Sequence, residues 1–174
     1  MRHGDGAVQR NMGIRERPHR LPGYAYRGRV VAVFTLCAYA KGPALASERI
    51  AEALAAMLAA AARKNGCRVL AYCFMPDHVH LVLQGLDDES DLRKTVADFK
   101  QATGFWFARN EKNVRWQKDF YDRIVRSPHH VAAEVRYVLE NPVRKGMVAD
   151  YQDYPFHGSI GIDLEEVLSS IITW

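Results

Sequence analysis

Two histidines separated by one residue are the most chemically informative feature of this sequence. His78 and His80 flank Val79 in the segment HVHLVL. In an extended strand, side chains two residues apart project from the same side about 7 Å apart, so both imidazoles could reach one ion. Because the pattern is short and common, two surface histidines on a half-exposed strand remain the alternative.

A tyrosine and an asparagine four residues apart form a second candidate constellation. Ser127-Pro128 is typical of a helix start, so we expect a helix from there to Glu140, ended by Asn141-Pro142. At 100° per residue, Tyr137 lies roughly 215° from the centre of the apolar stripe and points away from the core. The same polar side carries His130, Glu134 and Asn141. A solvent-facing tyrosine is again the alternative.

Hydrophobic periodicity predicts the elements that must position these residues. Strands are expected over residues 30–39, 68–75, 78–83 and 114–125, and helices over 47–63, 91–109, 127–140 and 163–172. The second and third strands form a hairpin through the Pro76-Asp77 turn. This order predicts an α+β fold, a ferredoxin-like or RRM-like antiparallel sheet with helices packed on one face.

Composition indicates one globular domain with an additional basic arm. The 174 residues are 48% hydrophobic, and we expect a flexible Arg-rich arm over residues 1–28 and a single domain over 29–174. Residues 1–29 hold seven arginines and two acids, a balance of 7 − 2 = +5, and the sequence pI of about 9.0 favours polyanionic partners.

The same composition excludes membrane and secreted classes. The longest apolar run, residues 53–62, is shorter than the roughly 18 residues of a membrane span, and the N-terminal residues lack a secretory signal. Cys37, Cys67 and Cys73 show no C-x-x-C spacing and are expected to be buried and reduced. We therefore expect a cytoplasmic, nucleoid-associated protein.

Three segments together resemble the Y1 (IS200-like) transposases of the HUH endonuclease superfamily, and most closely their REP-associated tyrosine transposase branch. The resemblance covers roughly residues 30–155. The segments are YCFMPDHVHLVL (residues 72–83), WQKDFYD (116–122) and YVLENPVRKGMV (137–148). The sequence departs from the family in its Arg-rich arm and at residues 156–159, which leaves the recognised DNA sequence open.

The resemblance implies a mechanism and a substrate. Tyr137 would be the nucleophile, and His78, His80 and Asn141 would hold a divalent ion, Mg²⁺ or Mn²⁺; no organic cofactor is expected. The enzyme would cleave and rejoin single-stranded DNA near hairpins through a 5′-phosphotyrosine, as a monomer or homodimer. The ion, or a neighbour such as Glu134 or His130, would help the phenol lose its proton.

Basic and aromatic residues are the candidate DNA contacts. Tyr121 is a rival nucleophile, but it lacks a ligand one helical turn later, and Tyr39 and Tyr72 are expected in the core. Trp106, Trp116, Phe120 and Tyr121 could stack on bases or pack in the core. The expected DNA-binding residues are Arg115, Lys118, Arg123, Arg126, Arg144 and Lys145.

Two other classes compete with this interpretation. A non-catalytic single-stranded nucleic-acid-binding module on an RRM-like sheet would need exposed aromatics but would have no use for the Tyr137–Asn141 pair. A zinc nucleobase deaminase would need H-x-E and P-C-x-x-C, and neither pattern occurs in the sequence.

Overall fold

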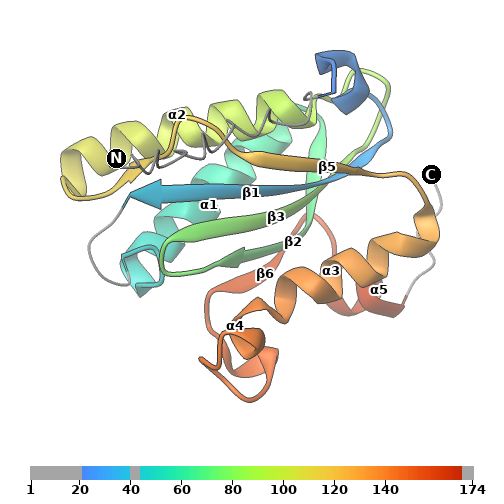
Figure 1. Ribbon diagram of the computed structural model, residues 1–174. Coiled ribbons are helices and arrows are strands. Elements are labelled where there is room, and N and C mark those ends of the chain that lie inside the picture. The colour runs from blue at the N-terminus through green and yellow to red at the C-terminus, as the bar shows by residue number, and fades with distance from the viewer. Residues whose placement is uncertain (1–20, 40–43, 170–174) are drawn as a thin grey trace, which may run out of the picture.

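A computed structural model gives the fold of the protein, and it describes residues 21–39 and 44–169 (Figure 1). Most of the predicted arm therefore lies outside the described residues. Tyr26, within the predicted arm, is buried against Phe34. The packed part of the chain thus begins before residue 29, where we expected the domain to start.

Six strands in the described part of the chain form one antiparallel sheet in the order β4-β1-β3-β2-β6, with β5 also pairing with β1. The strand predicted over residues 114–125 is two short strands, both beside β1. The strands are β1 (Val31–Tyr39), β2 (Cys67–Phe74), β3 (His78–Gly85), β4 (Arg115–Trp116), β5 (Tyr121–Val125) and β6 (His157–Ile160).

Two long helices cover one face of this sheet, which confirms the predicted α+β architecture (Figure 1). These are α1 (Glu48–Lys64) and α2 (Leu92–Asn110). The shorter α3 (Val131–Leu139) and α5 (Leu164–Ser169) lie against part of the opposite face. The remaining helical segments are α4 (Asn141–Arg144), η1 (Gly23–Tyr26), η2 (Pro128–His130) and η3 (Tyr151–Asp153).

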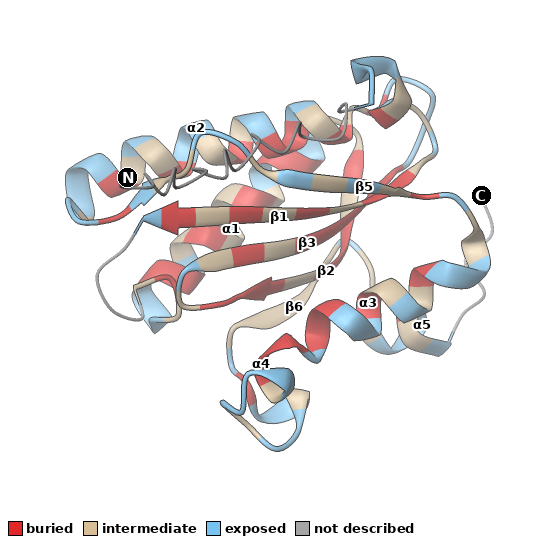
Figure 2. Cartoon of the chain, in the orientation of Figure 1, coloured by how far each residue is buried: buried red, intermediate tan, exposed pale blue. Residues whose placement is uncertain are grey.

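Side chains of the central strands alternate between two apolar layers, as the pleat of a strand requires. In β1, Phe34 and Leu36 are buried on the side of α1 and α2, whereas Val31 is buried in the layer of α3. Figure 2 shows buried residues along both β1 and β3. Thr35, between Phe34 and Leu36, therefore faces away from the two long helices.

The end of the predicted third helix differs from expectation. We expected Asn141-Pro142 to end the helical backbone, but α3 ends at Leu139 and α4 begins at Asn141. Glu140 keeps helical angles (φ −78°, ψ −1°), and Pro142 falls in the first turn of α4, where its missing N–H is not needed. This helical corner buries Asn141 instead of exposing it.

No helix in the described part of the chain has both the length and the apolar character that crossing a bilayer would require.

At Gly85, the end of β3 lies so close to the backbone of Gly28 that a larger side chain should destabilise the fold. A Cβ on Gly85 would lie 2.0 Å from the Gly28 carbonyl oxygen, so Gly85→Ala forces a backbone shift. We expect the free energy of unfolding to fall by about 1–3 kcal/mol, measured by urea titration. Gly104→Ala in α2 is the control, because its Cβ would enter open space and alanine favours a helix. Equal midpoints for Gly85→Ala and wild type would contradict the close approach.

Candidate functional site

The two histidines of the H-x-H motif converge at the start of β3. Their Nε2 atoms are 3.0 Å apart, and the rings are close to perpendicular, with an angle of 86° between their planes. Both side chains lie on the sheet face opposite α1 and α2, because His80 pairs with Thr35 across the sheet. The structure therefore brings together the two imidazoles that spacing alone had paired.

Each ring is held through its other nitrogen. Nδ1 of His78 is 2.6 Å from the Asp77 carboxylate, and Nδ1 of His80 is 2.9 Å from the Thr35 hydroxyl. A carboxylate accepts hydrogen bonds, so Nδ1 of His78 carries a proton, and Nε2 is the nitrogen that faces His80. Metal-binding histidines are commonly held through the second nitrogen in this way. Sequence reasoning missed Asp77 and Thr35 as supports.

The pKa of His80 is lowered, so its ring is neutral at physiological pH. Burial, and next the nearby His78, lower the pKa of His80 to about 4, although a side-chain hydrogen bond with Asn141 acts in the opposite direction. At neutral pH the ring is therefore uncharged, and a nitrogen lone pair is available for a ligand.

Asn141 joins this pair to the helix that carries Tyr137. Its Nδ2 donates to the backbone carbonyls of Tyr137 (2.8 Å) and Val138 (3.2 Å). Because Nδ2 is occupied, the side-chain oxygen of Asn141 is the atom that meets His80. The three predicted metal ligands are thus neighbours.

The geometry of these donors fits a divalent ion. Two adjacent ligands about 2.1 Å from an octahedral ion lie about 3.0 Å apart, which is the separation of the two Nε2 atoms. Two imidazoles and an amide oxygen suit Mn²⁺ and later metals better than Mg²⁺, which prefers a shell of oxygen ligands. Among the described residues, no group of three or more His, Cys, Asp or Glu side chains is placed to hold a metal.

Tyr137 lies on α3 and is half exposed, as its position opposite the apolar stripe predicts. The Arg144 guanidinium carbon is 4.0 Å from the centre of its ring, a cation–π contact, and Glu140 binds Arg144 at 3.0 Å. Arg123 also lies near this ring, and the hydrogen bond that it donates to Glu134 is the main cause that raises the pKa of Arg123. Two guanidinium groups therefore stand beside the phenol.

The two residues suggested to help deprotonate Tyr137 lie on α3 and in η2. Glu134 accepts a hydrogen bond from Arg123 at 2.5 Å, so its carboxylate is already engaged. His130 is exposed in η2, about two helical turns before Tyr137. Their part in deprotonating Tyr137 stays a prediction.

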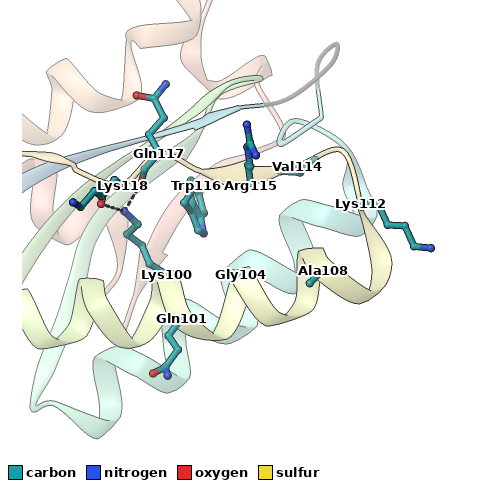
Figure 3. Close-up of a pocket in the computed structure, with 10 residues that line it drawn as sticks. All are labelled: Lys100, Gln101, Gly104, Ala108, Lys112, Val114, Arg115, Trp116, Gln117 and Lys118. Atoms are coloured by element: carbon teal, nitrogen blue, oxygen red, sulfur yellow. Dashed lines mark hydrogen bonds between the residues drawn. The ribbon is translucent and has the colours of Figure 1, made fainter.

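The remaining basic candidates are spread over the surface. A groove of about 560 Å³ lies between α2 and residues 114–118, and Arg115 and Lys118 are among the residues that line it (Figure 3). Lys100, which also lines this groove, donates to the carbonyls of Gln117 (2.8 Å) and Lys118 (3.1 Å). Arg126 and Lys145 are exposed at other positions, after β5 and after α4. The six basic candidates therefore do not form one cluster.

The aromatic candidates separate into core and surface groups. Trp116 packs against Phe99 on the α2 side, and Phe120 packs against Phe34, so the core interpretation holds for both. Tyr121 is 76% exposed on β5. The prediction that Tyr39 lies in the core is wrong, because it is 55% exposed where β1 pairs only with the two residues of β4.

The fold and the site together define a class of protein: a ferredoxin-like sheet with an H-x-H pair on its central strand and one tyrosine-bearing helix against it. The chain belongs to the IS200-like transposase family, whose model matches residues 30–139.

Similar proteins agree with this assignment. REP-associated tyrosine transposases from Haemophilus influenzae and Escherichia coli K12 are each 28% identical, over 100 residues (50% of this chain, 56% of the relative) and 94 residues (54% and 55%). The chain thus spans about half the length of the curated relatives it matches. The structure of a REP-associated tyrosine transposase bound to a REP hairpin shares the fold, with a TM-score of 0.67, 22% identity and 82% coverage of each chain.

The convergence of the imidazoles predicts metal binding independently of any reaction. In calorimetric titration with Mn²⁺, we expect the double variant His78→Ala/His80→Ala to lose binding, because two of three donors are gone. Asn141→Ala should bind more weakly but detectably, since water can replace one amide oxygen. His129→Ala, an exposed histidine in η2, is the control and should bind as wild type does. Unchanged Mn²⁺ binding by a folded double variant would contradict this assignment.

Proposed function

We propose that the chain is a metal-dependent endonuclease and transposase that cleaves and rejoins single-stranded DNA near hairpin, REP-like elements. The observation that carries this proposal is the position of Asn141, which touches both the Tyr137 carbonyl and His80. Family membership supports the same reaction class. A purely DNA-binding module would not account for a tyrosine whose helix is joined in this way to a neutral imidazole.

His78, His80 and Asn141 are the residues that would hold the divalent ion, Mg²⁺ or Mn²⁺. When bound there, such an ion neutralises charge on the phosphate oxygens and aligns the scissile phosphorus. The protein's contribution is to keep His80 neutral through burial and to hold the two rings in place through the contacts of Asp77 and Thr35.

Tyr137 supplies the nucleophile. Its oxygen forms a bond to the scissile phosphorus while the bond from phosphorus to the 3′ oxygen breaks; the phenol loses a proton and the 3′ oxygen gains one. The product is a 5′-phosphotyrosine with a free 3′-hydroxyl, and attack by a 3′-hydroxyl reverses the step without ATP. Arg144 and Arg123, beside the ring, favour negative charge on the phosphate during this step.

A single strand suits this site better than a duplex. Tyr137 is half exposed on a helix beside an open sheet face, so a strand that is free to splay can bring its phosphate to the phenol. A similar protein was solved with a REP hairpin, and this supports a hairpin as the partner of the present chain. The proposal applies equally to a monomer and to a homodimer.

The nucleophile can be tested with a labelled hairpin oligonucleotide that carries single-stranded flanks. In Mn²⁺, wild type should yield a covalent protein–DNA adduct on a denaturing gel, and Tyr137→Phe should yield none while still binding the DNA. Tyr24→Phe, an exposed tyrosine on η1, is the control and should form the adduct normally. An adduct that survives in Tyr137→Phe and disappears in Tyr121→Phe would assign the reaction to the rival tyrosine.

Cleavage should depend on whether the DNA at the cleavage site is single-stranded or paired. Cleavage in the flank at the foot of the hairpin should exceed cleavage of the same sequence in a full duplex by at least about 10-fold, because exposing a paired base costs a few kcal/mol. Initial rates on both substrates measure this ratio. Equal rates would count against the single-stranded mechanism.

A further inference from the structure

Two exposed tyrosine rings lie on the same sheet face as the imidazole pair. Tyr121 is 76% exposed and Tyr39 is 55% exposed, although both belong to strands of the central sheet. Large rings in such strands usually pack in a core, as Phe34 does one residue before Thr35. Their exposure therefore needs an explanation that the cleavage chemistry does not supply.

The register of the sheet fixes where the rings stand. Tyr121 is directly opposite Thr35, and Thr35 is directly opposite His80. With neighbouring strands about 4.8 Å apart, the Tyr121 backbone is about 10 Å from that of His80, in the same row. Tyr39 is four residues beyond Thr35 on the same side of β1 and one row past Cys37, which pairs with His78. Tyr121 thus stands in the row of His80, and Tyr39 stands one row beyond that of His78.

Each ring has an arginine on the same face. Arg115 pairs with Tyr39 in the sheet, and its guanidinium carbon is 5.2 Å from the centre of the Tyr39 ring. Figure 3 shows Arg115 and Trp116 on opposite sides of their strand, with Trp116 toward α2. Arg123 is two residues after Tyr121 and so shares its side. Aromatic rings interspersed with guanidinium groups match the alternation of bases and phosphates in a nucleic acid.

We propose that Tyr39 and Tyr121 are stacking platforms for unpaired bases of the DNA strand that enters the site, with Arg115 and Arg123 contacting its phosphates. This inference rests on the proposed function, because it names the path of that substrate. Only a single strand fits: a base must leave its stack to lie on a protein ring, and a paired duplex hides those faces. The surface is continuous with the imidazole pair, so a strand bound on the rings leads its backbone toward the reacting phosphate.

The test measures binding separately from cleavage. Fluorescence anisotropy with a labelled single-stranded flank, in a Tyr137→Phe background that cannot form the adduct, gives Kd for each variant. Tyr39→Ala and Tyr121→Ala should each raise Kd about 10-fold, whereas Tyr39→Phe and Tyr121→Phe should stay within about 2-fold, since phenylalanine keeps the ring. Tyr24→Ala, a 77% exposed tyrosine on η1, is the matched control and should not change Kd.

The salt dependence of Kd distinguishes base stacking from contacts with phosphates. Arg115→Gln should flatten the plot of log Kd against log salt concentration by about 0.7, the effect of one phosphate contact to a single strand. The alanine variants of the two tyrosines should shift the line without changing its slope. Because both rings are exposed, melting temperatures should stay at the wild-type value and so exclude unfolding as the cause.

Two outcomes overturn the inference: wild-type affinity in both alanine variants, or an equal loss of affinity for a fully paired duplex. Failure of the proposed function is recognised differently. If wild type forms no Tyr137 adduct but still needs both rings to bind single strands, the stacking surface stands and the cleavage proposal fails. If the adduct forms and the rings do not matter for binding, the cleavage proposal stands and the stacking surface fails.

Discussion

The pairing register between β1 and β3 is the constraint on which the site depends. Side chains alternate along a strand, so a slip of one residue would turn both imidazoles toward α1 and α2 and bring Val79 out to the open face. Burial of Phe34 and Leu36 under the helices prevents that slip. The same register places the Thr35 hydroxyl opposite His80, so apolar packing on one face determines the polar contact on the other.

The second constraint is the corner between α3 and α4. Val135 and Val138 anchor α3 on the sheet, and the helical backbone at Glu140 keeps Asn141 turned inward. The amide then satisfies the end of α3 through its nitrogen and reaches His80 through its oxygen. Tyr137 is therefore positioned through the backbone one turn before Asn141, while its own ring remains accessible.

Local patterns in the sequence were sufficient for most of the fold and for part of the site. Hydrophobic periodicity located the central strands and the long helices, because each buries a regular stripe against one neighbour. The pairing of His78 with His80 followed from the two-residue repeat of a strand. The contact of Thr35 with His80 could not be predicted, since it joins residues 45 apart and needs the register. Tyr39 was misplaced for a similar reason: its strand is apolar, but its neighbour at that point is the two-residue β4.

The two faces of the sheet differ in the side chains that they carry. The face under α1 and α2 is filled by apolar side chains and supplies stability. On the other face, Arg123 and Arg144 approach Tyr137 while each is bound to a glutamate, Glu134 and Glu140. These ion pairs orient the guanidinium groups and limit their mutual repulsion. Because ion pairs with exposed partners contribute little to stability, the phosphate of the proposed substrate would take over the guanidinium donors at small cost. The two guanidinium groups beside the phenol are thus held in place by their glutamates, and the ion pairs are weak enough to be replaced.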